Sequence, residues 1–158
     1  SSLPPKKDNP PPATSPRTGP PKCLIPYEKH DYRAFVFLVH DTHGLVLLHC
    51  TRKKKKPPHW QLPGGHVDED DFLKAARRSN DRDAQLIWAC KEGAARELYE
   101  ETGMDIRSHL DRLEPAKLRS EETSDDEKLL TNELKERLFF FLHTTDKDFV
   151  TEGDKDFA

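Results

Sequence analysis

The sequence predicts a mixed α/β domain in which one long helix packs on a small mixed sheet. Two β-rich apolar runs flank a turn between residues 33 and 50, a helical apolar stripe occupies residues 84–102, and another apolar run covers residues 137–143. Because strands precede and follow the helix, the chain falls in the α/β or α+β class.

Residues 1–22 are predicted to form a disordered, proline-rich tail. This segment is rich in Pro, Ser and Lys and has almost no apolar side chains, so it cannot bury enough surface to offset the entropy lost on ordering. The folded domain is expected to span residues 23–158, enough for one compact core. The missing initial methionine is compatible with a chain that is processed or cut from a longer protein.

Charge and cysteine content narrow the class of protein. A net charge of −3 argues against a general nucleic-acid binder. Cys23, Cys50 and Cys90 are an odd number without metal-ligand spacing, which favours a reducing compartment, and we expect the cytoplasm. No apolar run approaches the length of a membrane span.

The N-terminal half is expected to contain a hairpin and a glycine turn. Arg33–His40 and Leu45–Cys50 are β-rich runs on either side of the turn "DTHG", which is the pattern of a hairpin. "WQLPGGHV" then combines a short extended piece with a Pro-Gly-Gly turn, where Gly64 and Gly65 allow positive φ and a close backbone approach. Residues 68–82 are charged and are predicted to be a loop with at most one helical turn.

A helix is predicted from about Ala84 to Thr102. Its apolar stripe consists of Ile87, Ala94 and Leu98, and Gly103 is a natural C-terminal stop. Beyond it, residues 115–119 are expected to form a strand, 120–132 an acidic loop, and 137–143 a second strand.

Three glutamates crowd one face of this helix. Glu97, Glu100 and Glu101 lie within an arc of roughly 100°, and like charges at this spacing destabilise a helix by a few tenths of a kcal/mol per pair. A solvated helix face is the plain explanation. The alternative is a hard cation held by carboxylate oxygens, with Gly64 and Gly65 offering close backbone contact to a phosphate.

The residues also resemble a known family. "LPGGHVD" followed by "AARELYEETGM" is similar to the Nudix hydrolases, whose signature is Gly, five residues, Glu, seven residues, then Arg-Glu-aliphatic-any-Glu-Glu-any-Gly-aliphatic. The second half is complete from Arg96 to Met104. The resemblance implies an α/β/α sandwich, here without a clear terminal helix, that hydrolyses a nucleoside diphosphate linked to another moiety with Mg²⁺, or Mn²⁺ in its place.

The resemblance also implies roles for individual residues. Glu97 and Glu101 would bind the metal directly, Glu100 would bind it directly or through water, and the backbone of Gly65 would lie beside it. Arg96 would orient the glutamates by ion pairing. A metal-activated water would attack phosphorus, and the general base would be a signature glutamate or one from a distant loop, for which the sequence offers Glu121, Glu122 and Glu152.

The first half of the signature departs from the family. The position eight residues before Arg96 holds Trp88, and the interval from Gly65 to Arg96 is longer than expected by about fifteen residues. The upstream carboxylate is expected either from the acidic group after the glycines, with the extra residues bulging out, or from the helix itself. The candidates are Glu69, Asp70, Asp71 and Glu92.

The basic cluster, Trp60 and the histidines can each be interpreted as functional or as structural. Arg52–Lys56 would steer an anionic substrate, or it is a solvated loop or an address signal. Trp60 is expected to anchor the core rather than to stack on a base, and the histidines are treated as structural, with His66 excepted because it follows Gly65.

Two rival functions stay open. One is a retired Nudix fold that binds a nucleotide, an RNA end or a protein without turnover, and the other is an interaction module that uses the tail as a polyproline ligand. The expected partner on the enzyme interpretation is a small phosphorylated compound.

The predicted tail gives a direct stability test. Removing residues 1–22 should change the free energy of unfolding by less than about 1 kcal/mol, the scale of surface changes, as measured by thermal denaturation of the full-length and shortened chains. A large drop in melting temperature would show that the tail packs on the domain.

Overall fold

The computed structural model describes residues 22–51, 56–119, 130–131 and 133–149. Its helices are α1 (Glu69–Ala76) and α2 (Arg82–Thr102) with the short 3₁₀ turns η1 (Tyr27–Lys29), η2 (Leu110–Arg112) and η4 (Asp146–Phe149). Its strands are β1 (Arg33–His40), β2 (Gly44–Val46), β3 (Leu48–Cys50), β4 (His59–Gln61), β5 (Gly64–His66), β6 (Glu114–Pro115), β7 (Leu118–Arg119), β8 (Leu130–Thr131), β9 (Glu133–Leu134) and β10 (Arg137–Thr144). The predicted tail lies outside the described residues except for Lys22.

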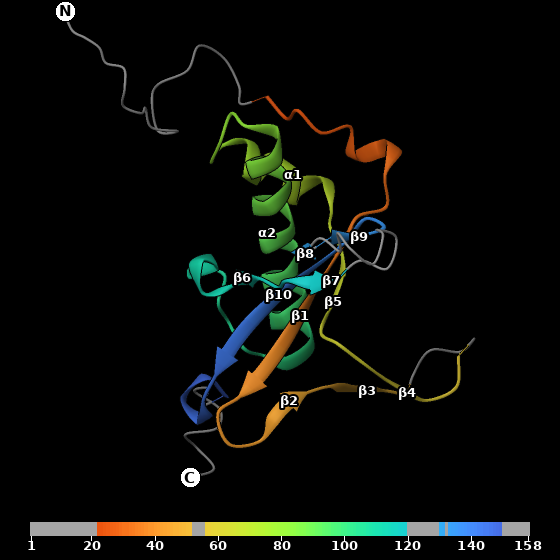
Figure 1. The fold of residues 1–158 in the computed structure, drawn as a ribbon, viewed down its shortest axis with the longest axis vertical. Helices are drawn as coiled ribbons and strands as arrows, with labels where there is room; N and C mark the ends of the chain where they lie inside the picture. Colours follow the sequence, from red (N-terminus) through yellow and green to blue (C-terminus); the bar gives the residue numbers. More distant parts are fainter. Residues whose placement is uncertain (1–21, 52–55, 120–129, 132, 150–158) are drawn as a thin grey trace, which may run out of the picture.

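The sheet is built around a parallel pair, β1 and β10, whose register joins Arg33 to Arg137 and His40 to Thr144. β2 and β5 pair antiparallel with opposite ends of β1, while β6 and β9 pair antiparallel with β10. Figure 1 shows these two long strands running side by side through the centre of the molecule. The mixed sheet and the mixed α/β class are therefore confirmed.

One face of the sheet forms the core. Alternate residues of β1 and β10 are buried, and they belong to the same apolar cluster as the inner faces of α1 and α2. Every second strand residue is buried, and the helices bury one face with a period of 3.6 residues. These two buried surfaces pack together, as expected for a two-layer fold. Both α-helices therefore lie on this side (Figure 1). The opposite face carries a stack of phenylalanines, Phe35, Phe37, Phe139 and Phe141.

Helix α2 confirms the predicted helix with a start two residues earlier. The Asp81 side chain caps it by accepting a hydrogen bond from the Ala84 backbone nitrogen at 2.9 Å, and Gly103 ends it in the left-handed conformation at φ 81°. Its buried Gln85 bonds the Lys22 carbonyl and the Leu24 backbone nitrogen, which fixes the described start of the chain against the helix.

The prediction of a loop over residues 68–82 was wrong for its first half. Residues 69–76 form α1, which begins with a capping box between Asp68 and Asp71. Phe72, Ala75 and Ala76 are buried at helical spacing, and the acidic first turn suits the positive end of the helix dipole. The high charge of this segment concealed a short amphipathic helix.

Two predicted strands are interrupted. The run Leu45–Cys50 splits into β2, which pairs with β1, and β3, which pairs with β4 in a separate ribbon. Residues 115–119 split between β6 and β7, which pair with β10 and β8. In both cases the chain changes partner, so it leaves one sheet before entering another. The strand predicted at 137–143 is confirmed as β10. Of the predicted acidic loop, residues 120–129 and 132 lie outside the described part.

Burial of Phe72 gives a test of α1. Its ring stacks on Tyr27 with centroids 5.4 Å apart, and it is 1% exposed. We expect Phe72→Ala to lower the free energy of unfolding by roughly 3–5 kcal/mol, the range for a buried phenylalanine, in urea denaturation. The matched control is Leu73→Ala, whose side chain is 42% exposed, with an expected loss below about 1 kcal/mol. Equal losses would contradict the described placement of the helix.

Candidate metal and phosphate site

The glycine turn places backbone where side chains could not fit. Gly64 begins β5 opposite Phe35 with φ +147°. A Cβ at Gly64 would lie 2.2 Å from the Ala34 carbonyl oxygen and 2.8 Å from the Phe35 Cα. Any other residue would therefore push β5 away from β1, and the close approach predicted for this turn needs a glycine here.

Two of the predicted glutamates converge on this turn from α2. A Cβ at Gly65 would lie 2.8 Å from the Glu97 side-chain carboxyl carbon, so the missing side chain is what admits that carboxylate. The Gly64 backbone nitrogen donates a hydrogen bond to Glu101 Oε1 at 2.9 Å. Since residues four apart share a helix face, Glu97 and Glu101 reach the turn together. Glu100 lies on the same helix, and its side chain is 58% exposed.

Arg96 holds the carboxylates around it in a network. Its guanidinium lies 2.8 Å from Asp71, 3.2 Å from Asp68 and 3.2 Å from Glu97. It also donates to the His66 carbonyl at 3.1 Å, directly after the glycine turn. The arginine thus joins α2 to both β5 and the start of α1.

The acidic candidates for the upstream position separate clearly in the structure. Asp71 is 2% exposed and receives Arg96. Glu69 is exposed and raises the pKa of Tyr27, Asp70 faces Lys74 at 3.5 Å, and Glu92 pairs with Arg78 at 3.2 Å. Of these four candidates, Asp71 is the one that the described contacts place against Arg96.

Sequence spacing could have identified Asp71. Counting the family's five intervening residues from Gly65 leads to Asp71, an aspartate where the signature has glutamate. The inserted residues lie after Asp71. The signature has seven residues between the upstream acidic residue and the arginine, whereas this chain has residues 72–95 there. They complete α1, the connection to α2 and the first turns of α2. The insertion separates Asp71 from Arg96 along the sequence, but α1 places the Asp71 carboxylate beside Arg96 in the fold.

The electrostatics favour a cation at this place. Burial raises the pKa of Glu97 above its usual value, and the charges of Glu100 and Asp68 raise it further against the opposing effect of Arg96. Burial alone would lower the pKa of Arg96, but the hydrogen bond and charge of Asp71 raise it overall. The arginine therefore stays charged, while Glu97 remains in a field that disfavours its negative form.

The donor set fits a hard divalent cation. Glu97 and Glu101 offer carboxylate oxygens beside backbone at the two glycines, and Glu100 is close along the helix. Oxygen donors of this kind, with room left for water and phosphate oxygens, are what Mg²⁺ requires. The absence of a side chain at Gly65, which lets the Glu97 carboxylate lie against the backbone, is the structural feature consistent with this fit.

Several other predicted features lie elsewhere. Trp60 is 63% exposed and stacks on His49 with centroids 4.3 Å apart, so the prediction of a core anchor was wrong. His66 is exposed and lies 3.0 Å from Asp31. Of the basic cluster, Lys56 is exposed and residues 52–55 fall outside the described part. Glu121, Glu122 and Glu152 fall outside it as well.

One protein-family model matches part of this chain. The family model described as the NUDIX domain matches residues 29–79. This part of the chain is similar to the Nudix family. The match contains β1, the glycine turn and α1, and it ends before α2, so the Arg96–Gly103 motif adds a Nudix feature outside the matched range. No curated protein matches the chain. Within the described residues, no helix has the length and apolar character needed to cross a membrane.

The buried Asp71–Arg96 pair can be tested by mutation. Asp71→Ala leaves the Arg96 guanidinium without its closest carboxylate and removes the acceptor for the Asp68 backbone nitrogen. We expect the free energy of unfolding to fall by about 2–3 kcal/mol, below the value for fully buried pairs because Arg96 is 27% exposed. Asp70→Ala, which alters an exposed neighbour in the same helical turn, should cost less than about 0.5 kcal/mol. Chemical denaturation of both variants measures the difference, and similar losses would contradict the assignment.

Proposed function

We propose that this chain is a metal-dependent pyrophosphohydrolase that cleaves a nucleoside diphosphate linked to another moiety, or a related polyphosphate. The single observation that carries the proposal is the convergence of Glu97 and Glu101 on the Gly64–Gly65 turn. A solvated helix face would have no reason to bring Glu101 to the Gly64 backbone nitrogen and Glu97 against Gly65, which admits that carboxylate only because it has no side chain.

In this proposal, Glu97 and Glu101 hold Mg²⁺ or Mn²⁺ with the backbone of Gly65 alongside, and Glu100 contributes directly or through water. When bound, the ion would neutralise phosphate charge and lower the pKa of a coordinated water. Arg96 acts as a positioning residue, since its contact with Glu97 at 3.2 Å is anchored on the other side by Asp71.

The reaction adds one water molecule across a P–O–P link. A water oxygen forms a bond to one phosphorus, the bond from that phosphorus to the bridging oxygen breaks, and two phosphorylated products leave. Positioning and charge stabilisation account for most catalysis of this type, which matches a site made of carboxylates, one arginine and close backbone. The general base remains a proposal among the signature glutamates, Glu121, Glu122 and Glu152.

A retired Nudix fold that binds without turnover is the second candidate. Its argument from sequence was the displaced upstream carboxylate, and the contact of Asp71 with Arg96 weakens that argument. Clustered carboxylates with a raised Glu97 pKa are also a cost that a binding module need not carry. A hydrolysis screen with Mg²⁺ over nucleoside triphosphates, ADP-ribose, dinucleoside polyphosphates, inositol pyrophosphates and capped RNA would separate the two and name the substrate.

We also propose a reducing, cytoplasmic location. Cys23, Cys50 and Cys90 are free thiols in the structure, which is compatible with this location. Burial raises the pKa of Cys90, so this thiol is kept protonated inside the core.

Glu101→Gln tests the proposed metal role. The amide oxygen can still accept the Gly64 hydrogen bond, so the fold should persist and the metal-free protein should become slightly more stable by loss of like-charge repulsion. Mg²⁺ at about 5 mM should raise the melting temperature of the wild type but not of the variant, and hydrolysis should fall by orders of magnitude.

Asp83→Asn is the matched control, because it removes one carboxylate from the exposed first turn of the same helix. It should keep both the Mg²⁺ shift and the turnover. If Glu101→Gln showed the same Mg²⁺ shift and turnover as wild type, Glu101 would not be a ligand.

A further inference from the structure

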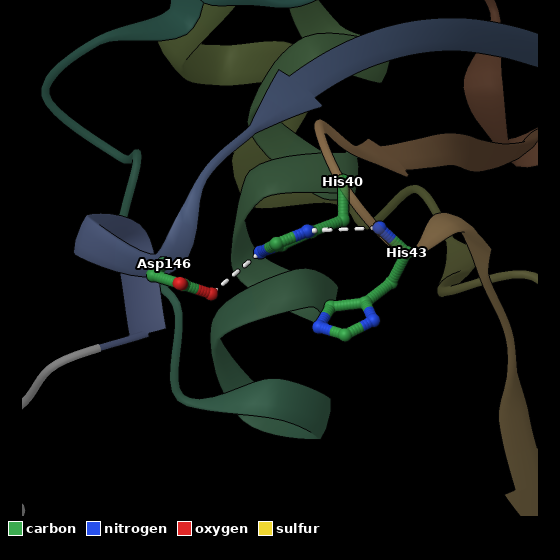
Figure 2. Close-up of side chains that lie close together, drawn as sticks. All are labelled: His40, His43 and Asp146. Atoms are coloured by element: carbon green, nitrogen blue, oxygen red, sulfur yellow. Dashed lines mark hydrogen bonds and ion pairs between the residues drawn. The ribbon is translucent and has the colours of Figure 1, made fainter.

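A second cluster of metal-binding side chains lies at the far end of β1. His40 ends that strand, His43 lies in the turn to β2, and Asp146 begins η4 after β10. One potential ligand atom from each of the three falls within 4.8 Å of the others. Figure 2 shows the two imidazole rings one above the other, with the Asp146 carboxylate directed at His40. Asp146 Oδ1 is 2.8 Å from His40 Nε2.

We propose that His40, His43 and Asp146 form a binding site for a divalent transition metal of the zinc class. Imidazole nitrogens prefer Zn²⁺, Cu²⁺, Ni²⁺ or Fe²⁺, whereas Mg²⁺ prefers oxygen donors. Two imidazoles and a carboxylate are a common three-ligand set for zinc, with water in the remaining position. The cluster is open for that water, because His43 is exposed and the Asp146 side chain is 90% exposed.

The burial of His40 gives the site a fixed ligand. This residue is 4% exposed, and its Nδ1 lies 3.1 Å from the Thr42 backbone nitrogen and 3.2 Å from that of His43. The ring is thus held in place by the turn while Nε2 faces the carboxylate. A preset imidazole loses little conformational entropy when it binds a metal, and the two exposed ligands have only to close on it.

Binding at Nε2 requires the His40 ring proton to move from Nε2 to Nδ1, with no net loss of a proton from the ring. Backbone donors at Nδ1 assign the metal-free proton to Nε2, which donates it to Asp146. Zn²⁺ at Nε2 takes the place of that proton, and a neutral ring then carries its proton on Nδ1. Asp41 Oδ1 at 3.2 Å and the Thr42 hydroxyl oxygen at 3.1 Å are the available acceptors. A carboxylate beside the distal nitrogen is the usual outer partner of a metal-bound histidine.

The backbone N–H groups that contact His40 Nδ1 affect the metal affinity of this site. The N–H groups of Thr42 and His43 lose their acceptor on binding, but both residues are exposed and water can replace it. We therefore expect a weaker site than a closed four-ligand zinc centre. The metal would join the β1–β2 turn to the segment after β10, two parts of the chain that are distant in sequence.

This cluster is separate from the glycine turn. His40 lies five residues beyond Phe35, the partner of Gly64, which corresponds to about 17 Å along a strand at roughly 3.3 Å per residue. Its ligands are also chemically different from those of the glutamate site. Failure of one site therefore leaves the other intact.

Calorimetric titration of the whole chain with Zn²⁺ tests the proposal, with Mg²⁺ present at about 5 mM to occupy the proposed glutamate site. The wild type should bind one equivalent with a rise in melting temperature. His43→Ala and Asp146→Asn change exposed ligands and spare the buried His40. Each should weaken binding by about a hundredfold or more, since outer partners alone contribute about 10–100-fold.

His109→Ala is the matched control, because His109 is exposed and outside the cluster, and it should bind Zn²⁺ like the wild type. Nitrogen-15 NMR of the imidazoles should show the metal-induced shift at His40 Nε2. No Zn²⁺ binding by the wild type, or equal affinity in His43→Ala and Asp146→Asn, would overturn the proposal. Loss of the Mg²⁺ effect in Glu101→Gln with unchanged Zn²⁺ binding would separate the two metal sites.

Discussion

The ion pair between Arg96 and Asp71 is the interaction on which the candidate site depends. It joins α2 to α1 across the buried side of the fold, and the same guanidinium holds Glu97 and the carbonyl after the glycine turn. The helices can approach this closely because Gly93 faces Asp71; a Cβ there would lie 3.1 Å from Asp71 Oδ2. A glycine in the middle of a helix costs about 1 kcal/mol, and here it makes room for the carboxylate that anchors the arginine.

The position of the glutamates within α2 adds to their mutual repulsion. Glu97, Glu100 and Glu101 occupy the end of the helix, where the backbone dipole is negative, and the last turn contains no basic residue. Arg96 offsets part of this charge but is shared with Asp68 and Asp71. The local potential thus combines three unfavourable contributions, from burial, neighbouring carboxylates and the helix end, each of which a bound cation would relieve. Such an arrangement favours ligand binding over the stability of the metal-free chain.

Strong periodicity made β1, β10 and α2 predictable from sequence, and the complete motif from Arg96 to Met104 located the glutamates. Helix α1 was not predicted, because only Phe72, Ala75 and Ala76 mark its buried face in an otherwise charged segment. Trp60 was misplaced because residue type alone does not reveal that β3 and β4 form a ribbon separate from the main sheet. The upstream carboxylate stayed ambiguous because four acidic residues were considered together. The family's spacing from Gly65 already favours Asp71, and the structure supports this choice because Asp71 is buried against Arg96.

The parallel pairing of β1 with β10 also affects how this chain reaches its folded state. These central strands lie about a hundred positions apart, with Arg33 opposite Arg137, and the two α-helices α1 and α2 lie between them in the sequence. Loop closure over such a separation is slow compared with local helix formation. During synthesis on the ribosome, β1 can acquire its hairpin partner early, but its other edge must wait for nearly the whole domain to emerge. Until then it presents an unpaired apolar edge, the kind of surface that chaperones protect from premature association.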